Sequence, residues 1–236
     1  MFFEVLRSDS GRGEIAVARS EDLLRWSYIG VVLAEPMHLS YPHVFAHDGT
    51  VYMVPESHEA SSVRLYRARD FPMRWEFVGS LVDGKPFVDA SLVLHHGHWY
   101  MFVGTIPHGG FTSQSLHLYH ADVLEGPWLE HGSSPLIRDD PRMARPAGRV
   151  IEHESVLVRY VQDCETTYGY RVFAITIESL TPTDYRERQL GDEPVVGPGP
   201  FPWNSGGMHH VDAHRLDGTW FAAVDGWALR FARSRR

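Results

Sequence analysis

The sequence predicts an all-β fold, a five-bladed β-propeller whose first blade is incomplete. Segments that alternate apolar and polar residues recur at intervals of roughly 50 residues, which is a propeller-like period. Hairpin turns recur in phase with these segments, and no stretch has a convincing helical periodicity. Such alternation is typical of half-buried strands, and it occurs at residues 14–20, 63–69, 116–122, 170–176 and 228–234. An irregular β-sandwich of similar length is the alternative.

Blade one is expected to contain strands at residues 2–5, 14–20 and 27–33. It has no segment for the innermost strand, which would leave unpaired backbone at the central channel. A second chain or the C-terminal end of the same chain would cover this edge. A homo-oligomer is therefore one expectation.

Each later blade is expected to begin with a hairpin. The turns of blades two and five are Asp48-Gly49 and Asp217-Gly218, and Asp-Gly between alternating strands is a strong hairpin signal. Blade three turns through His96-Gly97, and blade four turns near residues 152–155. The outer fourth strands, absent from blade five, open with an aromatic residue at Trp26, Trp75, Trp128 and Tyr185.

Composition is consistent with one folded domain over residues 1–236. Hydrophobic residues make up 43% of the chain and aromatic residues 12%, which excludes disorder and collagen-like structure. The formal net charge is -8, from 22 basic and 30 acidic residues. A nucleic-acid or anionic-membrane binder would usually have the opposite sign. We therefore expect a polar small molecule as the partner, and neither nucleic acid nor membrane.

A single cysteine, Cys164, excludes an internal disulfide framework and a multi-cysteine metal site. The N-terminus lacks a charged region followed by an apolar run, and no stretch approaches 18 apolar residues. We expect no signal peptide, no transmembrane helix and a cytoplasmic protein. No cofactor and no metal are predicted.

An insertion is expected at residues 106–114, and its Gly109-Gly110 is not a phosphate loop because no lysine or helix follows.

Several motifs carry a resemblance to a known family. The main ones are Ser40-Tyr-Pro-His-Val-Phe45, Tyr52-Met-Val-Pro-Glu56 and Ala144-Arg-Pro-Ala-Gly-Arg149. Over residues 1–227, the sequence resembles the five-bladed propeller domain at the N-terminus of plant glucosamine inositolphosphorylceramide transferases. That domain is similar in turn to the furanosidase-like propellers of glycoside hydrolase family 43.

The second resemblance implies carboxylates placed around a central funnel. Glycosidases need one protonated and one ionised carboxyl group, and these propellers carry the general base on the innermost strand of blade one. The present sequence lacks that strand, so the resemblance implies a pseudo-glycosidase that binds a sugar-like or glycosylated ligand. One alternative is an enzyme of specialised metabolism with isomerase- or cyclase-type acid–base chemistry. Another is an active glycoside hydrolase with an Asp-Pro strand upstream of Met1.

The candidate catalytic residues are Glu56, Asp89 and His210. The resemblance places Glu56 at the rim of the funnel, at the end of the second strand of blade two. Asp89 opens the innermost strand of blade three and resembles an aspartate of some propeller glycosidases. His210 lies in a histidine-rich strand and shares a face with Asp212. The alternatives are a surface-loop acid for Glu56, a turn-capping residue for Asp89 and a channel-lining imidazole for His210.

The candidate substrate-binding residues offer charge, hydrogen bonds or an aromatic face. A guanidinium group can grip a carboxylate, phosphate or diol, and a loop aromatic can stack on a sugar ring. A structural ion-pair network, channel-lining histidines and hydrophobic packing are the alternatives. We expect Glu56, Asp89, Arg145, Asp163 and His210 to converge at one end of the funnel. The substrate-binding set is His43, Arg145, Arg149, Asp163, Tyr168, Trp203, Asn204 and His209.

Overall fold

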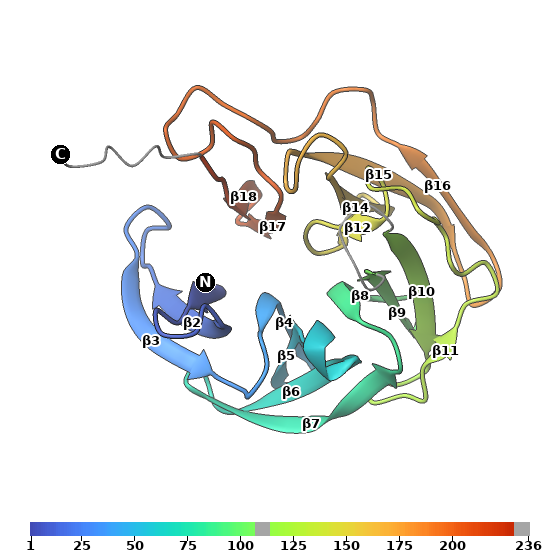
Figure 1. Cartoon of the computed structure of the whole chain (residues 1–236). Helices are drawn as coiled ribbons and strands as arrows, with labels where there is room; N and C mark the ends of the chain where they lie inside the picture. Colours follow the sequence, from blue (N-terminus) through green and yellow to red (C-terminus); the bar gives the residue numbers. More distant parts are fainter. Residues whose placement is uncertain (107–113, 229–236) are drawn as a thin grey trace.

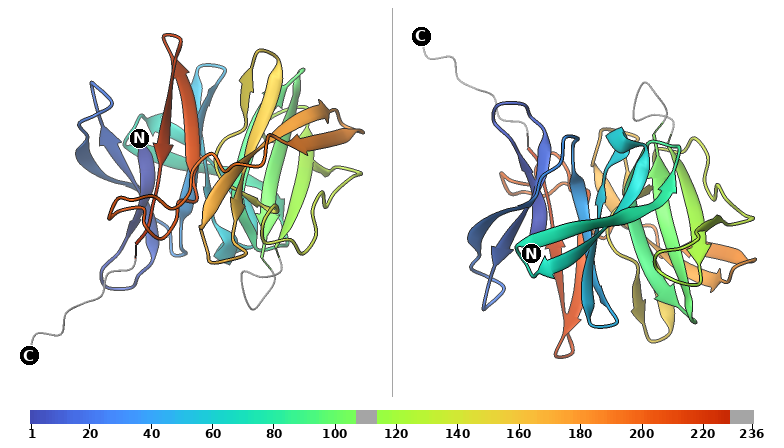
Figure 2. Two further views of the ribbon diagram at one scale, coloured as in Figure 1. Left: turned by 90° about the horizontal axis from the view of Figure 1, so that it is seen from above. Right: turned by 90° about the horizontal axis from the view of Figure 1, so that it is seen from below.

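The computed structural model describes residues 1–106 and 114–228, and it forms a ring of five sheets around a central axis (Figure 1). The two views in Figure 2 show the blades side by side, with their strands running along the axis. This arrangement confirms the predicted five-bladed propeller. The one helix described is the short 3-10 helix η1 (His58–Ala60), and no helix among the described residues is long and apolar enough to cross a membrane.

Blades two to four each contain an inner hairpin followed by outer strands. Blade two consists of β4 (Ser40–His47), β5 (Thr50–Glu56), β6 (Ser62–Asp70) and β7 (Arg74–Asp83). Blade three consists of β8 (Phe87–His95), β9 (His98–Thr105), β10 (Ser115–Ala121) and β11 (Leu129–Glu130). Blade four consists of β12 (Arg145–Pro146), β13 (Ile151–His153), β14 (Val156–Asp163), β15 (Arg171–Leu180) and β16 (Tyr185–Gln189).

Blade one has the predicted three strands, β1 (Phe2–Leu6), β2 (Gly13–Arg19) and β3 (Ser27–Leu33), with β1 at the inner edge. Blade five contains β17 (Val211–Leu216) and β18 (Thr219–Val224). The strand predicted at 228–234 falls outside the described residues except for Ala228, and most of the insertion expected at 106–114 falls outside them too.

The inner hairpins turn tightly, as the sequence predicts. In blade two, Asp48 and Gly49 have φ values of 46° and 74°, as in the type I′ turns that match the twist of paired strands. In blade four, Glu154 and Ser155 have φ values of 51° and 63° without a glycine. All four hairpins therefore bring the starts of their inner strands to the same end of the ring.

Two inner strands carry a bulge near their start. Tyr41 and Asp89 have φ values of 41° and 53°, and the strand registers shift between Ser40 and His43 and between Val88 and Ser91. Both residues lie seven positions before the first residue of the turn, as does His210 in blade five. A bulge re-aims side chains, so this position presents polar groups at one end of the axis.

Apolar clusters fill the spaces between neighbouring blades. They join blades one and two, two and three, three and four, and four and five, through residues such as Ile15, Met53, Leu65, Met101, Tyr100, Leu157, Tyr160 and Val211. In contrast, no hydrogen bond or ion pair within the described ranges joins the strands of blade one to those of blade five. The ring therefore has a seam between its first and last blades.

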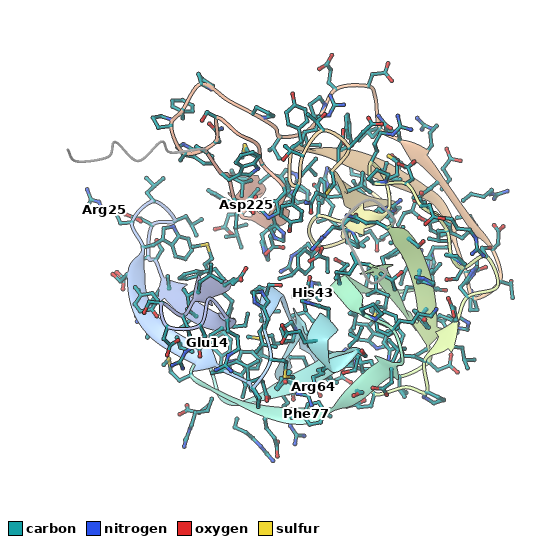
Figure 3. The ribbon with its side chains drawn as sticks, in the orientation of Figure 1. Glu14, Arg25, His43, Arg64, Phe77 and Asp225 are labelled. Carbon is teal, nitrogen blue, oxygen red and sulfur yellow. The ribbon has the colours of Figure 1, made fainter. Side chains whose placement is uncertain are left out.

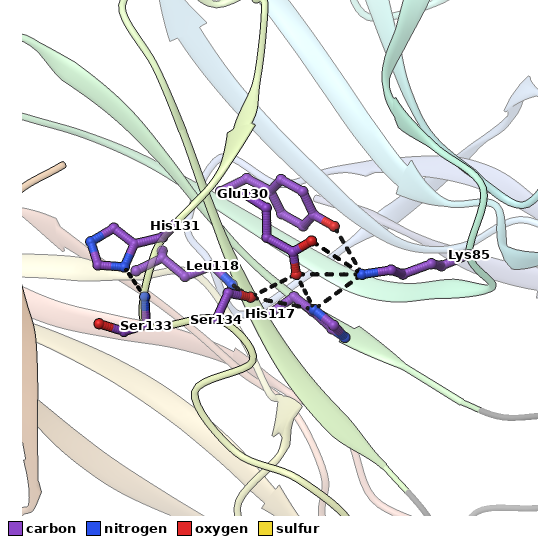
Figure 4. Close-up of polar contacts among 8 residues, drawn as sticks. Lys85, His117, Leu118, Glu130, His131, Ser133 and Ser134 are labelled. Carbon is purple, nitrogen blue, oxygen red and sulfur yellow. Dashed lines mark hydrogen bonds and ion pairs between the residues drawn. The ribbon is translucent and has the colours of Figure 1, made fainter. Parts of the chain in front are cut away.

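An outer polar cluster stabilises blade three (Figure 4). Lys85 is the single lysine of the chain, and its Nζ lies 3.3 Å from Glu130 Oε2. His117 Nδ1 lies 2.6 Å from Glu130 Oε1, and the hydroxyl of Ser134 donates to the same oxygen at 2.9 Å. These contacts fasten β11 to β10 and to the connection that enters β8.

Three blades are joined near the axis by the hydroxyl of Tyr41. It lies 2.9 Å from Ser91 Oγ and accepts a hydrogen bond from the Gly148 N–H at 2.6 Å. The Ser91 hydroxyl donates in turn to the Gly148 carbonyl at 2.9 Å. Blades two, three and four therefore meet in one small hydrogen-bonded group.

Removing this hydroxyl in Tyr41→Phe is expected to lower the free energy of unfolding by about 1–3 kcal/mol, because the Gly148 N–H loses its acceptor away from water. Urea unfolding followed by fluorescence measures the change. Tyr28→Phe is the matched control because the Tyr28 ring is exposed on β3. Equal stability of the two variants would contradict the role given to Tyr41.

Candidate functional site

Three polar side chains from three blades meet at the end of the axis where the inner strands begin. Glu56 ends β5, Asp89 lies in β8, and Arg145 forms β12 with Pro146. Arg145 donates from Nε to Asp89 Oδ2, and its Nη2 lies 3.6 Å from Glu56 Oε2. The side chains are only 6–7% exposed. We call Glu56, Asp89 and Arg145 the buried triad.

The two carboxyl groups of the buried triad share one proton. Burial raises the pKa of Asp89 to about 8; Arg145 opposes this shift, and the negative charge of the neighbouring Glu56 adds to it. Burial also disfavours ionised Glu56, but the hydrogen bond from His58 and the charge of Arg145 outweigh it and lower the pKa of Glu56. At neutral pH, Asp89 is therefore protonated, and ionised Glu56 is matched by Arg145.

Two histidines lie beside the triad on the side of blade one. His58, in η1, has its Nδ1 2.9 Å from Glu56 Oε1, and this hydrogen bond raises the pKa of His58. The ring of His38, in the connection from β3 to β4, is centred 6.2 Å from that of His58. His38 Nε2 lies 3.1 Å from Oε1 of Glu4, a residue of β1. Burial raises the pKa of Glu4, and His38 opposes the shift.

An aromatic and acidic group lies on the side of blades four and five. The Arg145 guanidinium is 5.0 Å from the centroid of the Tyr168 ring, which lies 5.2 Å from the ring of His209. The Nδ1 of His209 is 2.8 Å from Asp225 Oδ2, and its backbone N–H donates to Asp225 Oδ1 at 3.0 Å. Asp225 and His43 lie toward the centre of the ring, whereas Phe77 lies on the outer wall (Figure 3).

These groups form one set around the axis, to which all five blades or their connections contribute. Its outer members are partly exposed, and they surround the buried triad. Sequence reasoning identified Glu56, Asp89, Arg145, Tyr168 and His209 but missed the other four. We call the set the rim cluster: Glu4, His38, Glu56, His58, Asp89, Arg145, Tyr168, His209 and Asp225.

Arg149 and His43 belong to a different layer. Arg149 pairs with Asp212 through Nε and Nη2, and its Nη2 also donates to the Val44 carbonyl at 3.2 Å. His43 Nε2 accepts the Leu92 N–H at 3.3 Å, and burial lowers the pKa of His43 to about 3. Both residues therefore join neighbouring blades. For Arg149 this is the role of an arginine in a structural ion-pair network, the alternative to substrate binding given above. They also line a cavity of about 210 Å³ near the hairpin turns.

His210 lies beside Tyr41, with the two ring centroids 5.0 Å apart. Burial lowers the pKa of His210, so the imidazole is neutral at neutral pH. Within the described residues, no hydrogen bond joins its ring to the buried triad. His210 therefore lies at the predicted end of the axis, where the inner strands begin, but it is not part of the buried triad.

Asp163 does not join the rim cluster. Its carboxylate accepts hydrogen bonds from Arg171 Nε at 2.8 Å and from the Glu165 N–H at 2.9 Å. The preceding residue, Gln162, is the one in register with Arg145. Successive residues of a strand point to opposite faces, so Asp163 points away from the side that Gln162 occupies.

Trp203 and Asn204 hold a loop against blade five. A Cβ atom on Gly226 would lie 2.6 Å from Cε3 of Trp203, so the indole packs directly on that glycine. Asn204 is buried, and its Nδ2 lies 3.4 Å from Met208 Sδ. These contacts match the hydrophobic-packing alternative for Trp203.

In the part of the chain that the structure describes, no group of three or more His, Cys, Asp or Glu residues is arranged to hold a metal ion.

The ring of five sheets has the five-bladed propeller fold that is also found in glycosidases. The fold is similar to that of β-1,2-mannobiose phosphorylase from Listeria innocua, with a TM-score of 0.70 and 16% identity over 92% of this chain and 65% of that one. It is also similar to Zg3597, a family 117 glycoside hydrolase from Zobellia galactanivorans, with a TM-score of 0.60 and 14% identity over 87% of this chain and 61% of that one.

The chain belongs to the family described as Glucosamine inositolphosphorylceramide transferase 1, N-terminal, which matches residues 1–227. It is 39% identical over 232 residues to the Glucosamine inositolphosphorylceramide transferase 1 of Oryza sativa subsp. japonica, covering 96% of this chain and 31% of the relative. It is 34% identical over 233 residues to the protein of that name from Arabidopsis thaliana, covering 96% of this chain and 30% of the relative. The chain thus spans about a third of the length of these relatives.

Proposed function

We propose that the protein binds a polyhydroxylated, sugar-like or glycosylated ligand at the rim cluster and does not hydrolyse ordinary glycosides. The observation that carries this proposal is the pairing within the buried triad, where a single cation, Arg145, contacts both the Asp89 and the Glu56 carboxyl groups.

This pairing argues against hydrolysis. In glycosidases the two carboxyl groups flank the scissile bond and lie about 5–5.5 Å or 6.5–9.5 Å apart. Glu56 and Asp89 instead both contact the same guanidinium group, that of Arg145, and are almost completely buried. Neither group is placed to act on opposite sides of a sugar ring.

The partly exposed members of the rim cluster support binding. The carboxylates of Glu4 and Asp225 accept hydrogen bonds from hydroxyl groups, and the imidazoles of His38 and His58 exchange them. The ring of Tyr168 offers an apolar face for the C–H side of a sugar. The names of the relatives mention glucosamine and an inositolphosphoryl group, and both the sugar and the cyclitol belong to this polyhydroxylated class.

A second function, isomerisation or cyclisation of a metabolite, is favoured by one observation. Asp89 holds a proton with a pKa of about 8 beside Glu56, whose pKa is lowered. A protonated and an ionised carboxyl group side by side are the elements of general acid–base catalysis near neutral pH.

The test combines a binding screen with a turnover assay. We expect at least one monosaccharide or inositol to raise the melting temperature and to bind in calorimetry, while aryl furanosides and pyranosides are not turned over. Tyr168→Ala should weaken binding roughly two- to tenfold, since an aromatic contact contributes about 0.5–1.5 kcal/mol beyond water exclusion. Tyr28→Ala, on the outer strand β3, is the matched control.

Two outcomes would contradict this proposal. Glycoside turnover that disappears in Glu56→Gln or Asp89→Asn would show a hydrolase. Turnover of a metabolite that is not a glycoside, with the same sensitivity to these substitutions, would favour the acid–base enzyme instead.

A further inference from the structure

Glu4 lies on β1, the strand at the inner edge of the blade-one sheet that the structure describes. In blade two the second strand, β5, is covered on its inner side by β4. In blade one the corresponding strand is β1, and it forms the inner edge of the sheet. Glu4 therefore lies at the inner edge of its sheet among the described residues, and its side chain is 35% exposed there.

Glu4 is oriented by a histidine in a defined tautomer. The Gly13 N–H donates to His38 Nδ1 at 3.0 Å, so Nδ1 is the acceptor and Nε2 carries the hydrogen. This Nε2 lies 3.1 Å from Glu4 Oε1. The His38 backbone N–H is held as well, by Glu59 Oε2 at 3.0 Å. His38 is therefore a neutral donor aimed at Glu4.

Gly13 leaves the space that this arrangement needs. A Cβ atom at this position would lie 2.7 Å from Glu4 Oε1, 2.8 Å from His38 Cε1 and 2.3 Å from the Leu39 carbonyl oxygen. Any larger residue would displace the carboxylate or the imidazole. The contact between Glu4 and His38 therefore depends on glycine at position 13.

The charge of Glu4 is not matched by a neighbouring cation. No lysine or arginine forms an ion pair with Glu4 within residues 1–106 and 114–228, and the other carboxylates of the rim cluster have partners of their own. Arg145 matches Glu56, His58 contacts Glu56, and His209 contacts Asp225. Burial raises the pKa of Glu4 above its ordinary value, the nearby Glu56 adds to this shift, and the neighbouring His38 and His209 oppose it.

We propose that Glu4, oriented by His38, is the specificity-determining residue of the rim cluster and selects sugar-like ligands that carry a protonated amine. The ammonium group supplies the positive charge that Glu4 lacks and donates hydrogen bonds to its carboxylate. Asp225, 39% exposed on the opposite side of the seam, adds a second acceptor. A ligand with an anionic group at the same position is disfavoured by both carboxylates. This inference rests on the proposed function.

The test compares three sugars that differ at one substituent: glucosamine, glucose and N-acetylglucosamine. Calorimetric titration of the full chain is expected to give an affinity for glucosamine roughly two- to fivefold higher than for the other two, the range for a partly exposed ion pair. Glu4→Gln should abolish this preference, so that the three sugars bind the variant with similar affinities. Raising the salt concentration should reduce the preference, since screening weakens charge pairing.

Matched variants separate a direct role of Glu4 from a general loss of charge. Glu21→Gln removes an exposed carboxylate in the connection from β2 to β3 and should keep the preference. Gly13→Ala should reduce the preference because it disturbs both partners, and Glu4→Asp should restore part of what Glu4→Gln removes. Thermal unfolding of each variant establishes that it is folded.

The outcomes distinguish this inference from the function on which it rests. If glucosamine and glucose bind equally well, or if the preference survives Glu4→Gln, the role of Glu4 is refuted and sugar binding stands. Tighter binding of glucose 6-phosphate than of glucosamine would also refute it. If none of the three sugars, nor any other monosaccharide or inositol, binds, both the inference and the proposed function are wrong.

Discussion

Replacement of Arg145 by methionine is expected to lower the free energy of unfolding by about 3–5 kcal/mol at pH 7. Arg145 is buried and is the cation that Glu56 and Asp89 both contact. Its removal leaves the ionised Glu56 in a site with little access to water, and an uncompensated buried charge is among the most destabilising changes in a protein. Methionine keeps much of the side-chain volume, so loss of packing is a minor part of the effect.

Urea unfolding at several pH values measures this change. The deficit of Arg145→Met should shrink as the pH falls toward 4, because Glu56 becomes protonated, and Glu56→Gln should recover part of the lost stability in the double variant. Arg74→Met is the matched control, since Arg74 forms an exposed ion pair with Asp70 at 3.3 Å. If Arg145→Met lowers the free energy of unfolding only slightly, and equally at every pH, then removing Arg145 does not leave an uncompensated charge on Glu56.

Asp89→Asn is expected to change how stability depends on pH. The folded protein holds a proton on Asp89 up to a pKa of about 8, whereas the ordinary value is 3.8. Between these two values the unfolded chain releases a proton that the folded chain keeps, so stability falls as the pH rises, by up to about 1.4 kcal/mol per pH unit. Asparagine has no proton to lose, and its amide oxygen can accept a hydrogen bond from Arg145 Nε as Asp89 does.

The stability of Asp89→Asn relative to the native protein should therefore increase from pH 5 to about pH 8 and level off above it. Denaturant unfolding at each pH measures the difference. His43, His58 and His210 are present in both proteins, so their contributions largely cancel in the comparison. Asp48→Asn, at an exposed turn carboxylate, corrects for general loss of charge. A difference that stays constant across this range would mean that Asp89 is ionised in the folded protein.

The meeting of Glu56, Asp89 and Arg145 could be anticipated from the repeat. The hairpin turns fix where each inner strand begins, and the propeller brings those starts to one end of the axis. Tyr41, Asp89 and His210 hold the same position relative to their turns. Distant residues therefore become neighbours without any local sequence signal beyond this spacing.

The exclusion of Asp163 from the rim cluster, and the inclusion of Glu4 and His38, could not be predicted in this way. Asp163 and Gln162 are adjacent, and only the register of β14 with β12 decides which side chain faces Arg145. His38 lies in a connection outside the repeat, and Glu4 faces the site only because β1 forms the inner edge of blade one. His58 follows Glu56 by two residues, a spacing that could have suggested it as a partner.

The seam between blades one and five has a consequence for how the molecule would respond to its ligand. Glu4 lies on one side of the seam, and His209 and Asp225 lie on the other. A ligand that contacts both sides would crosslink the two ends of the ring. Its binding would therefore be coupled to closure of the seam, and the free energy of closure would contribute to the measured affinity. Amide hydrogen exchange in β1 and β17 would then slow when the ligand binds, while exchange in blade three would change little.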